Sequence, residues 1–239
     1  MLDEILYPNV ATTNWQMLIP ERIALTGLLA RLRPKRALEV GVYYGGSLSL
    51  IAQFCERVWA LDIDPLVPGR FNVPPNVDLR IGSATDLLEK TLNELDAAGE
   101  TLNFVLIDAD HSADGVRHDI EAFIRRPAPP REPMFILMHD SGNPECRRGI
   151  GSAGWASCPY VHLVELDFVP GQIVEHAIQN DRGEVWGGLA LAYLSPKPRT
   201  GDLHVSASSA TTVAAIQSCA GNLSLLRKRQ PEKGSRSYQ

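Results

Sequence analysis

The feature that most constrains the fold of this chain is a short apolar run that ends in a cluster of glycines, at residues 37–47. A run this short, bounded by turn residues, is typical of a buried strand, and the residues after it repeat at helical spacing from Ser47 to Cys55. Glycines let the backbone turn tightly and approach a ligand, while the free N–H groups of the following helix face the same turn. The stretch therefore predicts a strand, a glycine turn and a helix, with a candidate ligand site at the turn.

The glycine turn alone is equally well explained as an ordinary connection in an α/β domain. The spacing of Gly41, Gly45 and Gly46 differs from the G-x-G-x-x-G of dinucleotide-binding folds, so NAD is the least favoured ligand. The identity of the ligand must come from the rest of the chain.

Further strands and helices alternate along the chain. Strands are predicted at 37–40, 57–62, 77–81, 102–107 and 134–138, and helices at 20–32, 47–55, 84–95 and 113–124. This alternation predicts an α/β fold with a doubly wound, mostly parallel sheet. Two more β-rich segments, 160–169 and 185–194, suggest an antiparallel pair, which gives a seven-stranded Rossmann-like sheet with an antiparallel closing strand.

The 239 residues suit one domain with appendages. We expect an N-terminal arm or lid at 1–19, the main domain at 20–195, and a low-complexity, mostly disordered tail at 196–239. Residues 1–195 carry a net charge of −10 and residues 196–239 a net charge of +5.

The partners of the protein are constrained by its charge and by its cysteines. An acidic domain has no general attraction to nucleic acid or anionic membranes, and no uncharged apolar run approaches the roughly 18 residues of a membrane span. The four cysteines include no C-x-x-C pair, so zinc ribbons and thioredoxin-type redox sites are not indicated. The sequence shows no N-terminal signal pattern, so we expect a cytoplasmic protein with reduced thiols. The expected partner is a small molecule, and a homo-oligomer is compatible with the sequence.

Polar residues follow the predicted strands, where parallel sheets bind ligands. Asp62 ends the second strand, about 20 residues after the glycine turn, where an acid can accept hydrogen bonds from a ribose diol. Ser83 and Ala84 follow the third strand and leave room for a flat ring such as adenine. The alternative for Asp62 is that it caps the next turn, and for Ser83 that it caps the next helix.

Acids and histidines follow the fourth and fifth strands. Asp108 ends one strand, and His139 and Asp140 end the other, so the three side chains meet if these strands are neighbours. A divalent cation would relieve the repulsion between the carboxylates. The alternative is a set of surface acids paired with arginines, namely Arg117, Arg147 and Arg148.

His111 lies three residues after Asp108 and can point at a substrate bound to that cation. The ordinary pKa of histidine is close to neutral pH, which suits a general base. The alternative is a surface histidine without a role.

Together, these motifs resemble those of the class I S-adenosylmethionine-dependent methyltransferases, over about residues 20–195. The glycine motif is shared by that whole superfamily. The Asp-x-x-His and His-Asp motifs resemble more specifically the metal-dependent small-molecule O-methyltransferases, among them the caffeoyl-CoA, catechol, macrolide-sugar and cephalosporin-hydroxylase-like groups.

The resemblance implies a role for each residue. The residues that would line S-adenosylmethionine are Glu39 and Gly41 at the methionine end, Ser47 nearby, Asp62 at the ribose, and Ser83 and Ala84 at the adenine. Asp108 would lie against the cofactor and be the first ligand of Mg²⁺ or Mn²⁺, with His139 and Asp140 as the others. His111 would be the base in transfer of the methyl group to a hydroxyl oxygen.

The pair His139-Asp140 departs from the family, which usually has Glu-Asp, Asp-Asp or Asp-Asn there. Histidine is neutral and softer, so it shifts the metal preference toward Mn²⁺, Fe²⁺ or Zn²⁺, or it marks the loss of the metal. Two alternatives therefore stay open, a metal-independent O- or N-methyltransferase and an inactive protein that only binds. The acceptor pocket is expected near the tryptophans Trp15, Trp155 and Trp186.

Overall fold

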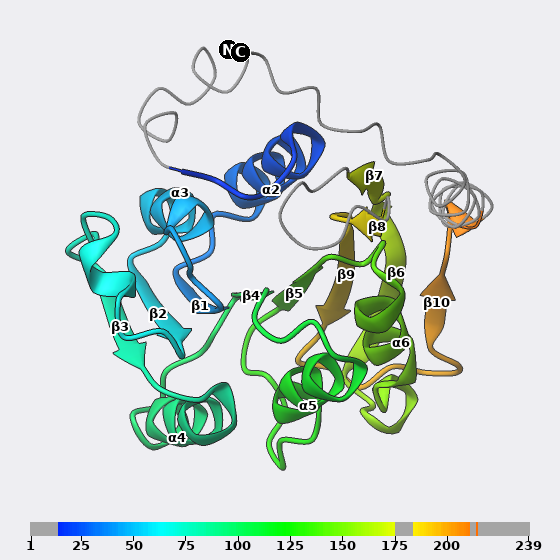
Figure 1. Ribbon diagram of the computed structural model, residues 1–239. Coiled ribbons are helices and arrows are strands. Elements are labelled where there is room, and N and C mark those ends of the chain that lie inside the picture. Colours follow the sequence, from blue (N-terminus) through cyan, green and yellow to red (C-terminus); the bar gives the residue numbers. More distant parts are fainter. Residues whose placement is uncertain (1–13, 175–183, 211–213, 215–239) are drawn as a thin grey trace, which may run out of the picture.

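The computed structural model describes residues 14–174, 184–210 and 214. They form one eight-stranded sheet and a separate two-stranded one, of β7 and β8 (Figure 1). The strands are β1 (Arg36–Val40), β2 (Arg57–Asp62), β3 (Val77–Ile81), β4 (Phe104–Ile107), β5 (Met134–His139), β6 (Val161–Val169), β7 (Gln172–Val174), β8 (Glu184–Trp186), β9 (Leu189–Leu194) and β10 (His204–Ser206). The helices are α2 (Ile19–Leu32), α3 (Gly46–Phe54), α4 (Ala84–Ala97), α5 (Ala113–Ile124) and α6 (Pro144–Ser152), with short 3₁₀ turns at Val67–Gly69 and Trp155–Ser157.

The large sheet has the strand order β10-β6-β9-β5-β4-β1-β2-β3. Strands β3, β2, β1, β4 and β5 are parallel, as their alternation with helices predicted. The chain starts at the central β1, runs outward to β3, and then returns to β4 on the other side of β1. The change of direction therefore falls between β1 and β4, where doubly wound sheets bind ligands.

Helices cover both faces of the sheet. In Figure 1, α2 and α3 lie on one side of the sheet and α4 and α5 on the other. Each face has its own core: Leu25, Leu29 and Leu48 are fully buried on the α2 and α3 side, and Leu88 and Ile120 on the α4 and α5 side. Burying side chains of this size contributes about 1.5–3 kcal/mol each, so the two cores hold the strand ends in a fixed relation.

The predicted antiparallel pair is confirmed, and it extends the sheet beyond β5. Strand β9 runs antiparallel to both β5 and β6. The predicted strand at 185–194 is divided into β8 and β9 by Gly187 and Gly188, which both have positive φ.

The large sheet has eight strands rather than seven because β10 pairs in parallel with β6. This strand lies within the stretch expected to be a tail, of which 211–213 and 215–239 lie outside the described residues. The side chain of Arg199 holds the chain before β10 through hydrogen bonds to backbone carbonyls, among them that of Val161 at 2.9 Å.

The described part of the predicted N-terminal arm packs against the domain. Trp15 and Met17 are 8% and 3% exposed and belong to the core on the α2 side. No helix in the described part of the chain is long and apolar enough to cross a membrane.

Candidate active site

The glycine turn connects β1 to α3 and packs against the end of β4. Gly41 has a φ of 91°, and its N–H donates to the carbonyl of Leu61 at 2.8 Å. A Cβ on Gly41 would overlap the carbonyl group of Asp108 and would lie 2.9 Å from the Cα of Ala109. The glycine is therefore required by the close approach of the strand that carries Asp108, in addition to any approach by a ligand.

The carboxylate of Asp62, at the end of β2, holds the glycine turn in place through hydrogen bonds to its backbone. Its Oδ2 accepts the backbone N–H groups of Val42 at 2.8 Å and Tyr43 at 2.9 Å, and its Oδ1 accepts that of Asp64 at 2.8 Å. The turn-capping alternative for Asp62 is thus realised in this structure. A carboxylate has about four acceptor positions, so one remains for a ribose hydroxyl.

Glu39 and Ser47 form a buried pair under the glycine turn. The Ser47 hydroxyl donates to Oε1 of Glu39, whose side chain is fully buried, while Oε2 has no hydrogen-bond partner. Burial raises the pKa of Glu39 well above its ordinary value, against the lowering effect of the Ser47 hydrogen bond. An unpaired buried oxygen of this kind is costly unless a donor reaches it.

Ser83 and Ala84 begin α4 as predicted. Ser83 is the N-cap residue, but its side chain makes no capping hydrogen bond. The Ser83 hydroxyl therefore does not cap the helix, which was the alternative to adenine binding.

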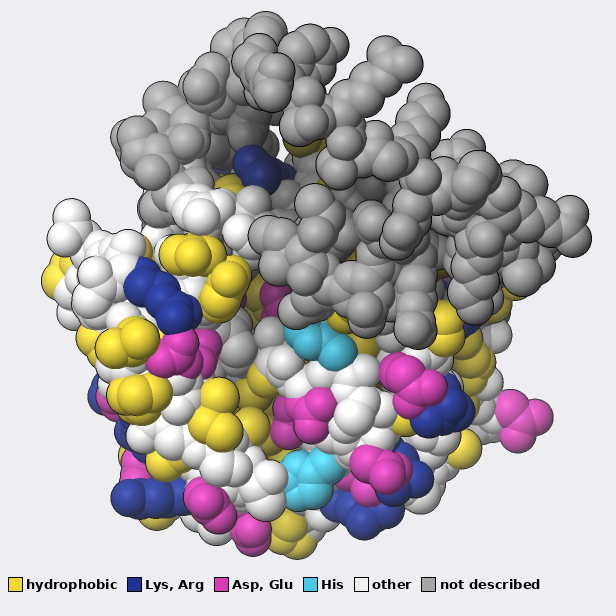
Figure 2. All heavy atoms as spheres, in the orientation of Figure 1, with side chains coloured by type: hydrophobic (Ala, Val, Ile, Leu, Met, Phe, Trp, Pro, Cys, Tyr) yellow, Lys and Arg dark blue, Asp and Glu magenta, His cyan; other side chains and the backbone are white. Residues whose placement is uncertain are grey.

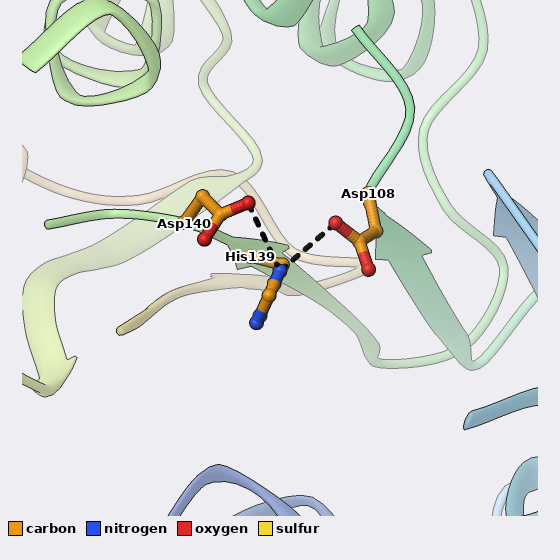
Figure 3. Close-up of side chains that lie close together, drawn as sticks. All are labelled: Asp108, His139 and Asp140. Atoms are coloured by element: carbon orange, nitrogen blue, oxygen red, sulfur yellow. Dashed lines mark hydrogen bonds and ion pairs between the residues drawn. The ribbon is translucent and has the colours of Figure 1, made fainter. Parts of the chain in front are cut away.

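Asp108, His139 and Asp140 come together as their strand positions predicted, because β4 and β5 are neighbours. Nδ1 of His139 lies 2.9 Å from Oδ1 of Asp108 and 3.3 Å from Oδ2 of Asp140 (Figure 3). One ligand atom from each of the three residues lies within 4.8 Å of the other two. Figure 3 shows Nε2 of His139 pointing away from both carboxylates.

The charges within the cluster shift the pKa values of His139 and Asp140 in opposite directions. Burial alone would lower the pKa of His139, but the charges of Asp108 and Asp140 and hydrogen bonds to them outweigh it and raise this pKa well above its ordinary value. Conversely, burial would raise the pKa of Asp140, whereas the attraction of His139 and the hydrogen bond from His111 lower it. The carboxylates of Asp108 and Asp140 therefore both face one imidazole nitrogen, Nδ1 of His139.

His111 completes the cluster from the loop that precedes α5. Its Nε2 lies 2.9 Å from Oδ2 of Asp140, and this hydrogen bond raises the pKa of His111. The His111 side chain is 43% exposed, and histidine and acidic side chains gather on the face shown in Figure 2. His111 thus links the buried carboxylate to the surface, where an acceptor can reach it.

Asp140 is held in an uncommon backbone conformation. Its φ is 55°, in the left-handed region that non-glycine residues seldom adopt, and its Oδ1 accepts the N–H of Gly187 at 2.6 Å. Such a conformation costs about 1–3 kcal/mol, and in proteins it concentrates at functional sites.

The arginines of the alternative explanation pair with other acids. Arg147 forms an ion pair with Asp167 at 2.5 Å. Arg117 pairs with Asp114 at 2.8 Å, and Arg148 pairs with Glu145, in both cases three residues away on the same helix. The acids of the cluster are thus compensated by histidines.

Two of the three tryptophans lie at or beside the cluster and the turn. The rings of Trp186 and His111 meet edge to face with centroids 5.3 Å apart. Trp15 packs on Gly46, next to the glycine turn, whereas Trp155 is in the core and donates Nε1–H to the Ile150 carbonyl at 2.7 Å. Of these three tryptophans, Trp186 is therefore the one in contact with His111.

One residue that contacts the cluster was not predicted from the sequence. Glu21, in the first turn of α2, is 1% exposed, and its Oε2 lies 3.2 Å from Nε2 of His139. An acid after Pro20 in a first helical turn ordinarily indicates a solvated residue that favours the helix dipole. No local signal identifies it, because its partner lies 118 residues along the chain.

Comparisons with known proteins bear on this arrangement. Residues 38–141 match the family described as a methyltransferase domain, a span that includes every residue predicted to bind cofactor or metal. The cofactor-bound protein Rv0187 from MTB is 21% identical, with 82% of this chain and 94% of that one covered and a TM-score of 0.53. An O-methyltransferase from Bacillus cereus, in complex with SAH, is 18% identical, with 81% and 90% covered and a TM-score of 0.51. No curated protein is detectably similar in sequence.

Proposed function

We propose that this chain, which is a class I S-adenosylmethionine-dependent methyltransferase, methylates a hydroxyl oxygen of a small molecule with the help of a divalent cation. The observation that carries the proposal is the set of Asp108, His139 and Asp140, with His111 beside it, at the ends of two central strands. The O-methyltransferase from Bacillus cereus, which has the same fold, supports transfer to oxygen.

The proposed cofactor site runs along the ends of β1, β2 and β3. The unpaired Oε2 of Glu39 suits the ammonium group of the methionine portion, because a charged donor would compensate a buried acceptor. Asp62 has an acceptor position left for the ribose, and Ser83 and Ala84 border the adenine. Ile63 follows Asp62 and is 73% exposed, so it offers an apolar surface to the adenine ring. S-adenosylmethionine supplies the activated methyl group.

The donor atoms of the cluster fit a divalent cation. Neighbouring ligands on an octahedral ion with bonds of about 2.1 Å are about 3 Å apart. The separations of 2.9 and 3.3 Å between Nδ1 of His139 and the two carboxylate oxygens match that requirement. A cation held by these three residues would act as a Lewis acid toward the acceptor oxygens. One imidazole and two carboxylates suit Mn²⁺ or Fe²⁺ at least as well as Mg²⁺.

His111 is the proposed general base. Because its Nε2 hydrogen-bonds to Asp140, its Nδ1 is the nitrogen left to receive the proton of the acceptor hydroxyl. Asp140 orients the ring and stabilises the imidazolium that forms. Trp186 packs against the His111 ring and limits its rotation.

The test is methyl transfer from tritium-labelled S-adenosylmethionine to a panel of small catechols and vicinal diols. We expect EDTA to abolish turnover, Mn²⁺ to restore it, and cofactor binding measured by calorimetry to persist in EDTA. The Asp108→Asn variant should behave like the chelated protein, whereas Asp114→Asn, which changes an exposed acid of the same segment, should be fully active. Full activity of the wild type in EDTA would exclude the role of the cation.

A second candidate, a metal-independent O- or N-methyltransferase, is favoured by one observation. The His139 ring faces carboxylates at both nitrogens, and its raised pKa favours the imidazolium form. That positive ring would then stand where a cation would bind. Turnover that is insensitive to EDTA, together with no metal in the purified protein, would select this candidate.

A further inference from the structure

Glu21 is a buried carboxylate that caps its own helix, α2, and also contacts the candidate site. Its Oε1 accepts the N–H of Gly188, and its Oε2 accepts the N–H of Leu18 at 2.6 Å. Oε2 also lies 3.2 Å from Nε2 of His139. A carboxylate that is 1% exposed is costly to bury, so its donors must compensate it.

The two nitrogens of His139 face different partners. Nδ1 faces Asp108 and Asp140, and Nε2 faces Glu21 on the opposite side of the ring. Because Glu21 is an acceptor, the nitrogen that faces it carries the proton when the ring is neutral. The lone pair is then on Nδ1, between the two carboxylates. Histidines that bind metals in proteins almost always donate the other ring N–H to a carboxylate or carbonyl in this way.

The corner between β8 and β9 ties Glu21 to the other side of the cluster. Gly187 donates its N–H to Oδ1 of Asp140 at 2.6 Å, and the next residue, Gly188, donates to Glu21. A Cβ on Gly187 would overlap the Glu21 carboxylate and would lie 2.9 Å from the side chain of Leu18. The N–H groups of Gly187 and Gly188 therefore fix both Asp140, a predicted metal ligand, and Glu21, which contacts the predicted ligand His139.

We propose that Glu21 is a positioning residue, which holds His139 with its proton on Nε2 so that Nδ1 binds the cation. This inference rests on the proposed function, since it assigns a role toward the cation that Asp108, His139 and Asp140 would hold. Glu21 itself is no ligand, because its carboxylate lies on the far side of the imidazole ring.

The inference is tested by Mn²⁺ binding to the full chain, followed by calorimetry and by pulsed electron paramagnetic resonance, which detects a coordinated imidazole nitrogen. We expect the wild type to bind one Mn²⁺ with an imidazole signal, and Glu21→Gln to bind it 10- to 100-fold more weakly. The matched control is Glu100→Gln, because Glu100 pairs with Arg36 at the opposite ends of the strands. This control should keep the affinity of the wild type.

A second measurement needs no variant at Glu21 and stands even if Glu21→Gln fails to fold. In the wild type loaded with Zn²⁺, nuclear magnetic resonance of ¹⁵N-histidine should show His139 with a protonated Nε2 and a coordinated Nδ1, assigned with His139→Gln. Coordination through Nε2, or equal Mn²⁺ affinity of Glu21→Gln and the wild type, would overturn the role of Glu21 alone. If Mn²⁺ binding is absent in the wild type or unchanged in Asp108→Asn, both the cation and the inference fail.

Discussion

Replacing Gly41 by alanine tests whether the glycine turn is shaped by the strand beside it. The left-handed φ of 91° at this position costs a residue with a side chain about 1–2 kcal/mol. The new Cβ would also overlap the backbone of Asp108, and such overpacking costs about 1–3 kcal/mol more. Gly41→Ala should therefore lower the free energy of unfolding by about 2–5 kcal/mol.

A matched control is available in the same chain. Gly27 lies inside α2, and a Cβ there would meet nothing within 4 Å. Gly27→Ala should raise the free energy of unfolding by about 0.8–1 kcal/mol, because alanine is the better helix former. The same substitution is thus expected to have opposite signs at the two positions.

The measurement is urea unfolding followed by circular dichroism, with the three proteins compared at one pH. The displaced strand end carries Asp108, so Gly41→Ala should also weaken the binding of Mn²⁺. A Gly41→Ala protein whose stability is within about 0.5 kcal/mol of the wild type, the range of ordinary surface substitutions, would refute the packing argument.

Three further predictions concern the core and the titrating groups. Burial raises the pKa of Asp119 to about 6 from 3.8, so the wild type should lose stability as pH rises from about 4 to 6. Thermal unfolding across pH should show Asp119→Asn to be more stable than the wild type by about 1–3 kcal/mol at pH 7, and no more stable than the wild type below pH 4. Phe104→Ala, which empties a fully buried position in β4, should cost about 3–5 kcal/mol in urea unfolding, and a loss below about 1 kcal/mol would contradict its place in the core. In the chelated protein, the pKa of His111 followed by nuclear magnetic resonance should lie above 6.5 because of its hydrogen bond to Asp140, and the stability from this pair should be present below that pKa and lost as pH rises through it.

Much of the fold could be predicted from local patterns. The helix at Ala113–Ile124 and the strand at Arg57–Asp62 have the predicted bounds, because apolar periodicity and end signals lie within the element itself. Strand β10 was missed because it is three residues long, lies in a Ser- and Ala-rich stretch, and is stabilised by its pairing with β6. Helix α6 was not among the predicted helices, and Gly149 within it lets it approach Ala113 of α5 closely.

The candidate site divides in the same way. Asp108, His139 and Asp140 were found because each follows a strand directly, and parallel strands bring their carboxyl ends to one edge of the sheet. The sequence by itself therefore determined the class of domain, the edge at which chemistry gathers and the residues supplied by consecutive strand ends. Only the tertiary structure decided that Asp62 folds the glycine turn, that Gly41 makes room for Asp108, and that Glu21 meets His139. The physical reason is that a hydrogen bond between residues far apart in the chain depends on how helices pack on the sheet, and local periodicity carries no record of that packing.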